Sequence, residues 1–391
     1  MRYDNLDMTQ INNGLEQTAA CGSSIAYDKA NGTAFVSYMT GVPKRYGEST
    51  GKICLSVFSP SQPHLVRHRV FDELQGKSRG FLCNALYVCG DKRVRVMFTD
   101  HSGQNALYSE DVDAKKTAPM AVYSREYDFA TDTVTERREV FFRTARGEEP
   151  INNETYCRYL RENGYEINSK WPPIINKVTQ YRGEWYTAIT LDDYAFSYAT
   201  LCKIEGDVLV PFAICPEKQT YEFRYFVNDE GIFGAFRAAP DDHGTNHAGY
   251  TVSRDGGKTW ETTIYADGVQ SRHDILEYYG KPLFIYNYKS DRSVENFPRM
   301  HNFRNALKFV YDGEVILDLF SKHGFVEHDT VSIRGELYMA FSNCPQALST
   351  ENGAAWTEDG LSVEQGKETV QWMKLGYLLP RSTKHGPNGR S

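Results

Sequence analysis

Residues 253–260, SRDGGKTW, decide the fold. The serine and aspartate side chains of this segment can hydrogen-bond to nearby backbone groups, its glycines permit a tight turn, and its tryptophan can pack against a sheet. The alternating run GYTV precedes it, so the pattern predicts a turn between two antiparallel strands. We therefore expect a structural rather than a catalytic role for this segment.

A degenerate copy of this turn occurs at residues 349–356, STENGAAW, with serine, glycine and tryptophan at the same offsets. Six hairpin patterns surround the two turns. Each begins with a small or polar residue and continues with an alternating apolar strand, a turn that usually carries glycine, and a second strand. The six copies are anchored at Ser24, Asn84, Asn176, Arg224, Asp274 and Asp329, with spacings of 60, 92, 48, 50 and 55 residues.

Most of these spacings fit one four-stranded sheet per repeat. We predict an all-β fold, a six-bladed β-propeller of four-stranded antiparallel blades that spans residues 1–380 as a single domain. A seventh blade in the 92-residue gap is the alternative. That gap contains an outer hairpin at residues 121–142 and a short helix near residues 150–165, with Asn153 as N-cap and Gly164 as stop. The tail at residues 381–391 is expected to be flexible.

Composition excludes several classes of function. The net charge of −7 argues against a broad basic surface for nucleic acid, and the 26 tyrosines and 21 phenylalanines favour strands. The sequence has no run of roughly 20 apolar residues and no N-terminal signal region, so we expect a cytoplasmic protein with no membrane partner. The eight scattered cysteines include no CxxC pair, so we expect buried reduced thiols, no metal and no cofactor.

The segment at residues 253–260 reads S-x-D-x-G-x-T-W and resembles the Asp box of the sialidase superfamily. This resemblance implies a propeller whose Asp boxes lie opposite the active site. The functional face is then built from the starts of the innermost strands and from the loops between second and third strands. Six of the ten histidines fall in those two locations: His101, His243, His247, His273, His301 and His328.

Each of these histidines could instead cap a strand or face solvent. His243 and His247 are four residues apart, but the glycine and asparagine between them indicate a loop rather than a metal-binding pair on a helix. The anchors Arg224, Asn84 and Asn176 also begin inner strands, so we include them among the residues of the pocket.

The resemblance extends to two possible carboxylate-binding arginines. Glu222 precedes one repeat and Arg237 follows its second strand, an arrangement similar to a sialidase stretch. By that match, Glu222 orients a catalytic partner and Arg237 binds the substrate carboxylate. Arg304, in the run RNAL, resembles the site of another such arginine, and Arg272 is a further candidate. Converging guanidinium groups suit a planar carboxylate and therefore predict an acidic sugar.

The sequence departs from the sialidase pattern in two places. The first repeat, CGSSIAYD, lacks the arginine that sialidases carry there. The start of the last repeat, residues 326–329 (VEHD), has His328 where sialidases have a nucleophilic tyrosine. His328 and His273 each precede an aspartate, Asp329 and Asp274 respectively, and could act as base and acid.

Three functions remain open. The first is a sialidase-like glycoside hydrolase that cleaves at an acidic sugar, with Glu222, Glu327, Asp274 and Asp329 as candidate carboxylates. The second is a lyase for uronate-containing glycans, in which histidine removes a proton and arginine stabilises the intermediate. The third is a glycan-binding propeller without catalysis. The expected partner is an acidic oligosaccharide, and the oligomeric state is left open.

Overall fold

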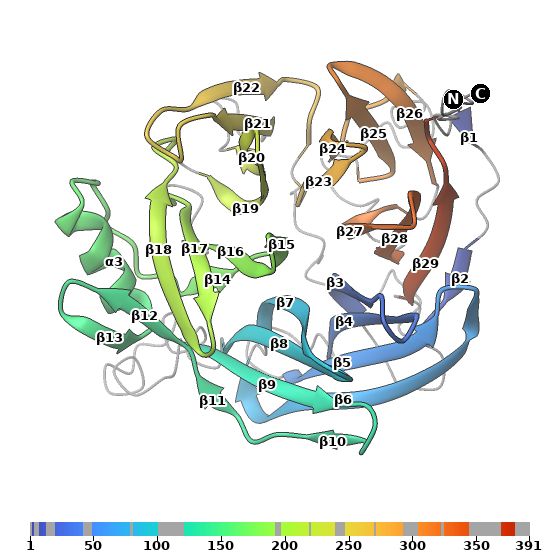
Figure 1. The fold of residues 1–391 in the computed structure, drawn as a ribbon, viewed down its shortest axis with the longest axis horizontal. Helices are drawn as coiled ribbons and strands as arrows, with labels where there is room; N and C mark the ends of the chain where they lie inside the picture. Colours follow the sequence, from blue (N-terminus) through green and yellow to red (C-terminus); the bar gives the residue numbers. More distant parts are fainter. Residues whose placement is uncertain are drawn as a thin grey trace, which may run out of the picture.

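A computed structural model provides the structure of the chain. It describes residues 2–3, 8–12, 20–41, 49–78, 81–100, 121–191, 197–218, 220–238, 247–269, 271–291, 304–321, 324–343 and 369–379. Within these ranges the protein is all-β with one short helix, and its sheets are arranged around a common centre as in a β-propeller (Figure 1). No helix in these ranges is long and apolar enough to cross a membrane.

The described strands pair into six sheets. The sheets are numbered in the order in which they occur along the chain, and the strands of each sheet are given from the innermost to the outermost. Sheet 1 contains β3 (Ala20–Asp28), β4 (Thr33–Gly41), β5 (Ser49–Ser59) and β6 (Gln62–Ser78). Sheet 2 contains β7 (Phe81–Gly90), β8 (Arg93–Asp100) and β9 (Val122–Asp128), with β10 (Thr133–Val134) and β11 (Arg138–Glu139) both paired to β9. Sheet 3 contains β14 (Pro173–Ile175) and β15 (Thr179–Tyr181), both paired to β16 (Glu184–Leu191), and then β17 (Thr200–Glu205), β18 (Val208–Ile214), β12 (Phe141–Thr144) and β13 (Gly147–Pro150).

Sheets 4 to 6 follow the same order. Sheet 4 contains β19 (Tyr221–Asn228), β20 (Gly231–Ala238), β21 (His247–Ser253) and β22 (Glu261–Tyr265). Sheet 5 contains β23 (Asp274–Tyr278), β24 (Lys281–Asn287), β25 (Ala306–Tyr311) and β26 (Glu314–Phe320), with β1 (Arg2–Tyr3) added in parallel to β26. Sheet 6 contains β27 (Val326–Ile333), β28 (Glu336–Asn343), β29 (Thr369–Gly376) and β2 (Met8–Gln10).

Strand β2 joins the first part of the chain to the last sheet. It pairs antiparallel with β29, so sheet 6 is completed by residues that precede sheet 1 in sequence. Apolar and aromatic side chains fill the space between sheets 6 and 1, where Trp372 stacks on Tyr338 and meets the edge of Phe58. The high aromatic content of the sequence thus packs neighbouring sheets against each other.

The helix α3 (Asn153–Glu162) lies where the sequence predicts it, and Gly164 follows it at a φ of 86°. The predicted N-cap was wrong. The side chain of Asn152, not Asn153, accepts a hydrogen bond from the backbone of Thr155, while Asn153 donates to the carbonyl of Trp171 and one other carbonyl. Asn152 is extended, as a cap requires, and Asn153 already belongs to the first turn.

The predicted outer hairpin at residues 121–142 forms in part. Strands β10 and β11 turn back antiparallel onto β9, whereas β12 leaves them and pairs with β18 of sheet 3. The described strands between residues 121 and 175 therefore extend sheets 2 and 3 and form no separate sheet. The five cysteines that the structure describes as free lie buried or half-buried, as predicted; they are Cys54, Cys89, Cys157, Cys202 and Cys215.

The segment at residues 253–260 forms the turn between β21 and β22, the third and fourth strands of sheet 4, as predicted. Asp255 accepts hydrogen bonds from the backbone of Lys258 and Thr259 and from the Thr259 hydroxyl. These bonds, above all those from Thr259, lower the pKa of Asp255 to about 2. Trp260 donates to the Gly257 carbonyl at 3.1 Å. The degenerate copy at residues 349–356 and the tail at 381–391 lie outside the described residues.

Candidate functional site

Four of the inner strands carry a β-bulge near their first residues. The pairing register shifts by one residue in β3, β7, β19 and β27, at equivalent places in sheets 1, 2, 4 and 6. In two of these bulges a glutamate adopts the left-handed conformation, Glu222 with a φ of 52° and Glu327 with a φ of 46°. A bulky residue with positive φ is strained, and a bulge redirects the side chain that it carries. The fold thus builds an irregular edge where the sequence predicts the functional face.

The strand-start cluster comprises six charged or titratable residues on this edge: Glu222, Arg237, Arg272, His273, Glu327 and His328. Its first ion pair lies within sheet 4, where Arg237 Nη1 donates to Glu222 Oε2 at 3.0 Å. Both side chains are only 5% exposed. A buried, hydrogen-bonded ion pair of this kind holds each partner in one orientation. The sequence did not predict this pairing of Glu222 with Arg237, and the roles predicted for the two residues stay predictions.

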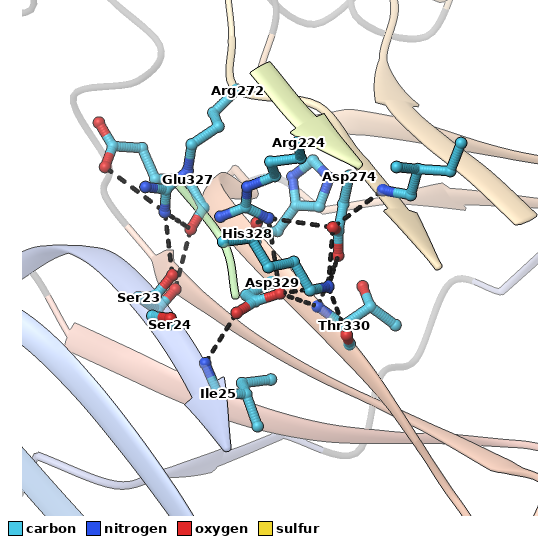
Figure 2. A network of polar contacts seen from close by, with 12 residues as sticks. Ser23, Ser24, Ile25, Arg224, Arg272, Asp274, Glu327, His328, Asp329 and Thr330 are labelled. Atoms are coloured by element: carbon cyan, nitrogen blue, oxygen red, sulfur yellow. Dashed lines mark hydrogen bonds and ion pairs between the residues drawn. The ribbon is translucent and has the colours of Figure 1, made fainter. Parts of the chain in front are cut away.

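The second ion pair joins three sheets. Arg272 Nη2 donates to the carbonyl oxygens of Ser23 at 2.9 Å and Glu327 at 3.0 Å, and it lies 3.8 Å from the Glu327 carboxylate (Figure 2). Arg272 precedes β23 of sheet 5, so its guanidinium reaches both β27 and β3. The guanidinium is 3% exposed, whereas the Glu327 side chain is 23% exposed. Glu327 is thus the more accessible of the two glutamates.

His273 and His328 occupy the same position in two neighbouring sheets, one residue before an anchoring aspartate. Both are fully buried, and their four ring nitrogens have no hydrogen-bond partner of normal geometry among the described residues. Buried polar groups are normally hydrogen-bonded, so these imidazoles have unused capacity for a polar ligand. The hydroxyls of Ser271 and Ser342, also buried, share this property.

Burial keeps both imidazoles neutral. It lowers the pKa of His328 to about 3, and the charges of Arg224 and Arg272 act in the same direction. Burial likewise lowers the pKa of His273 well below its ordinary value, assisted by His328, Arg237 and Arg304. The electrostatic effect of Arg237 and Arg304 on His273 indicates that these three predicted site residues share one region.

The remaining predicted residues are placed differently. Arg304 comes just before β25, and its carbonyl accepts hydrogen bonds from Asn287 and Phe325. Asn176 is buried and donates to Ala188 and Thr190 within its own sheet. His247 begins β21, and Asn84 lies at the bulge of β7. Three other predicted histidines, His101, His243 and His301, lie outside the described residues.

A second group, the axis network, lies between the inner strands. It consists of Asp274, Asp329, Arg224 and Lys177. Lys177 Nζ lies 2.9 Å from Asp274 and 2.7 Å from Asp329, and Arg224 Nη1 lies 3.2 Å and 3.5 Å from the same carboxylates. Both aspartates are fully buried. Burial alone would raise the pKa of Asp274, but Lys177 and Arg224 outweigh it and hold that pKa below its ordinary value.

Backbone groups complete this network and connect the sheets. Asp329 accepts from the Ile25 amide of sheet 1, and Asp274 accepts from the Thr330 amide of sheet 6 (Figure 2). Ser24 of sheet 1 in turn accepts from the Leu86 amide of sheet 2 at 3.2 Å. Because Lys177 belongs to sheet 3 and Arg224 to sheet 4, polar contacts link all six sheets at their centre.

Sequence reasoning missed Lys177. Its signal was present, since a lysine follows the anchor Asn176 directly at the start of an inner strand, in IINKVTQ. A lysine that is almost buried requires a carboxylate partner. The two aspartates that we proposed as catalytic are those partners.

Comparison with known proteins identifies the fold. No protein-family model and no curated protein matches the sequence. Among solved structures, the chain is similar to Trypanosoma rangeli sialidase in complex with sialic acid, with a TM-score of 0.57 and 9% sequence identity over 95% of this chain and 57% of that chain. The chain has the same β-propeller fold as this sialidase.

Two further structures support this sialidase-like fold. NanB sialidase of Streptococcus pneumoniae matches with a TM-score of 0.53 and 10% identity, over 94% of this chain and 70% of that chain. A protein of unknown function from Dyadobacter fermentans matches with a TM-score of 0.56 and 12% identity, over 94% of this chain and 98% of that chain. At these identities the similarity defines the fold, and the chain spans little more than half of the trypanosomal enzyme.

Proposed function

We propose that this protein is a carbohydrate-active enzyme, a sialidase-like hydrolase that cleaves a glycosidic bond next to a carboxylate-bearing sugar. The observation that carries this proposal is the strand-start cluster, in which buried arginines and glutamates line the irregular edge of sheets 4 to 6. We also infer that each of the six sheets is one blade of a six-bladed propeller.

Charge supports an acidic substrate. With both histidines neutral, the strand-start cluster contains the cations Arg237 and Arg272 and the anions Glu222 and Glu327, and Arg304 adds a further cation. The excess positive charge is complementary to a carboxylate, which guanidinium groups bind through paired hydrogen bonds. In our proposal Arg237, Arg304 and Arg272 together hold that carboxylate.

The exposures of the carboxylates suggest their roles. Glu327 is the more accessible glutamate and is our candidate for the carboxylate that acts on the glycosidic bond, while the more buried Glu222 orients Arg237. His328 and His273 are close enough to the arginines to exchange a proton with a bound substrate, and an entering anion would raise their pKa values. We assign Asp274 and Asp329 to positioning, because Lys177 and Arg224 already engage both.

A lyase remains a second candidate, and the two histidines favour it. Elimination requires a neutral base beside a carboxylate and a cation that stabilises the enolate-like intermediate. His273 and His328 are neutral and buried, their ring nitrogens make no hydrogen bond of normal geometry to the described residues, and arginines are near them. A base of this kind is less obviously needed for hydrolysis.

One experiment separates the two chemistries. The full-length protein would be incubated with sialylated and uronate-containing oligosaccharides, and products would be followed by mass and by the ultraviolet absorbance of an unsaturated uronate. We expect products that gain one water without new absorbance. Absorbance without added water would replace the hydrolase by the lyase, and no product from any acidic glycan would contradict both.

A further inference from the structure

A cavity of about 370 Å³ lies between sheets 4 and 5, away from the strand-start cluster. Its charged residues come from turns that join first to second or third to fourth strands, and these turns lie at the opposite end of the sheets from the starts of β19 and β23. The volume is within the range of about 300–1,000 Å³ that is typical of small-molecule sites. Its principal lining residues are Phe233, Tyr250, Tyr265, Phe284, Arg254 and Lys281.

Aromatic rings form the walls of this cavity. The ring of Phe284 lies 5.8 Å from that of Tyr250 and 5.3 Å from that of Tyr265, measured between centroids. Neither tyrosine hydroxyl has a hydrogen-bond partner in the part of the chain that the structure describes, although both rings are half-buried. Neither hydroxyl is among the buried polar atoms that lack a partner, so both are open to solvent and available to a polar ligand in contact with the rings.

The rim of the cavity has no net charge. Lys281 forms an ion pair with Asp312, and Arg254 lies over the ring of Phe233 and 3.4 Å from the Glu230 carbonyl. The cations Arg254 and Lys281 and the anions Asp312 and Glu230 therefore surround the opening. Because these charges balance, the cavity has no field that would select an anion.

We propose that this cavity binds an uncharged sugar ring. The apolar C–H face of a pyranose would pack on the half-buried rings of Tyr250 and Tyr265, since Phe284 and Phe233 behind them are only 2% exposed. Its hydroxyl groups would pair with the two tyrosine hydroxyls and with the polar rim. An uncharged sugar uses both aromatic surface and neutral hydrogen-bonding groups, which is the combination that this cavity offers. The site is independent of catalysis at the strand-start cluster.

The test is binding of simple sugars to the full chain, measured by saturation-transfer NMR and calorimetry. The probes are D-glucose, D-galactose and D-glucuronate. The double variant Tyr250→Phe, Tyr265→Phe keeps both rings and removes both hydroxyls. Its matched control is Tyr311→Phe, because Tyr311 is a half-buried tyrosine of β25 that does not line the cavity.

We expect a neutral hexose to bind, and its affinity to fall about tenfold or more in the double variant while Tyr311→Phe leaves it unchanged. Glucuronate binding should not depend on the two tyrosines. The proposal is overturned if neither hexose binds, if the double variant binds them normally, or if glucuronate loses affinity equally. Should the double variant unfold, Tyr265→Phe alone and the rim variant Arg254→Ala provide the same comparison.

Discussion

The axis network and the strand-start cluster are both buried, charged and contributed by several sheets, yet they differ in how completely their groups are paired. In the axis network, two carboxylates face two cations, and backbone amides occupy further carboxylate oxygens. In the strand-start cluster, two imidazoles make no hydrogen bond of normal geometry to the described residues, and two glutamates have positive φ. Complete pairing is typical of a structural role, whereas strain and unused hydrogen-bonding groups are typical of a functional site.

The largest effect that we expect is on folding, from Lys177→Met. Removing the ammonium group leaves Asp274 and Asp329 buried with Arg224 as their remaining cation. Breaking a buried ion pair in this way costs about 3–5 kcal/mol of unfolding free energy. Urea denaturation measures this loss, and the double variant Lys177→Met, Asp329→Asn should recover part of it. An unchanged midpoint for Lys177→Met would show that the axis network is not structural.

The next largest effect distinguishes the strand-start cluster from the axis network by making the same change, arginine to lysine, in each. Arg237→Lys keeps a positive charge beside Glu222 but loses the planar guanidinium, so we expect kcat/KM to fall by about 10²–10³ with little change in unfolding. Arg224→Lys should instead lower stability, since Arg224 contacts Asp274, Asp329 and the His328 carbonyl. Steady-state kinetics and urea denaturation are measured on both variants. Equal effects of both on stability and on activity would erase the distinction.

The features that could be predicted from the sequence are those that depend on residues close together in the chain. The hydrogen bonds of Asp255 that shape the turn at residues 253–260 are all local, so its residues sufficed to predict both its shape and its position between strands. The pairing of Glu222 with Arg237 was not predicted, although the two residues flank one hairpin and meet at its bulge. The helix cap was misplaced by one residue, since Asn152 and Asn153 are equally good caps and only tertiary contacts to Trp171 distinguish them.

Contacts between distant sheets could not be predicted. Nothing near Asp274 in sequence indicates Lys177, which is 97 residues away, or the Thr330 amide, which is 56 residues away. We therefore assigned Asp274 and Asp329 to catalysis from their position next to histidines alone. Likewise, the reach of Arg272 to Ser23 spans 249 residues, and it depends on the closure of the ring between sheets 5, 6 and 1.

The third prediction concerns pH and isolates the strand-start cluster. Because the pKa of His328 is about 3 in the folded protein and about 6.5 when unfolded, the unfolded chain binds a proton that the folded chain does not. Stability is therefore full above pH 6.5 and falls as pH decreases, by about 1.4 kcal/mol per pH unit for this histidine. His273 acts in the same direction, while Asp274 contributes only nearer its own unfolded pKa of about 4.

Substitution of the histidines tests this assignment. Phe223 occupies the equivalent position in sheet 4, so His328→Phe and His273→Phe are tolerable in shape and remove the titrating group. Urea denaturation between pH 6.5 and 4.5 should show a flatter slope for each variant than for the parent protein. His64→Gln, at an exposed histidine, is the control. A parent protein equally stable at both pH values would mean that neither imidazole is held neutral.

The smallest effect that we expect comes from Ser24→Ala, at the neutral hydrogen bond that continues the axis network from sheet 1 to sheet 2. Ser24 is 2% exposed, and its hydroxyl accepts a hydrogen bond from the Leu86 amide, which is one of several polar contacts between sheets 1 and 2. Loss of one neutral hydrogen bond costs about 0.5–1.5 kcal/mol, less than loss of a charge from the same network. Ser332→Ala, at a half-buried serine of β27, is the control for side-chain removal in a strand. A loss of unfolding free energy as large as that of Lys177→Met would mean that the sheets are held together by the continuity of these contacts rather than by the balance of charge. It would also place the weakest point of the fold far from the proposed site.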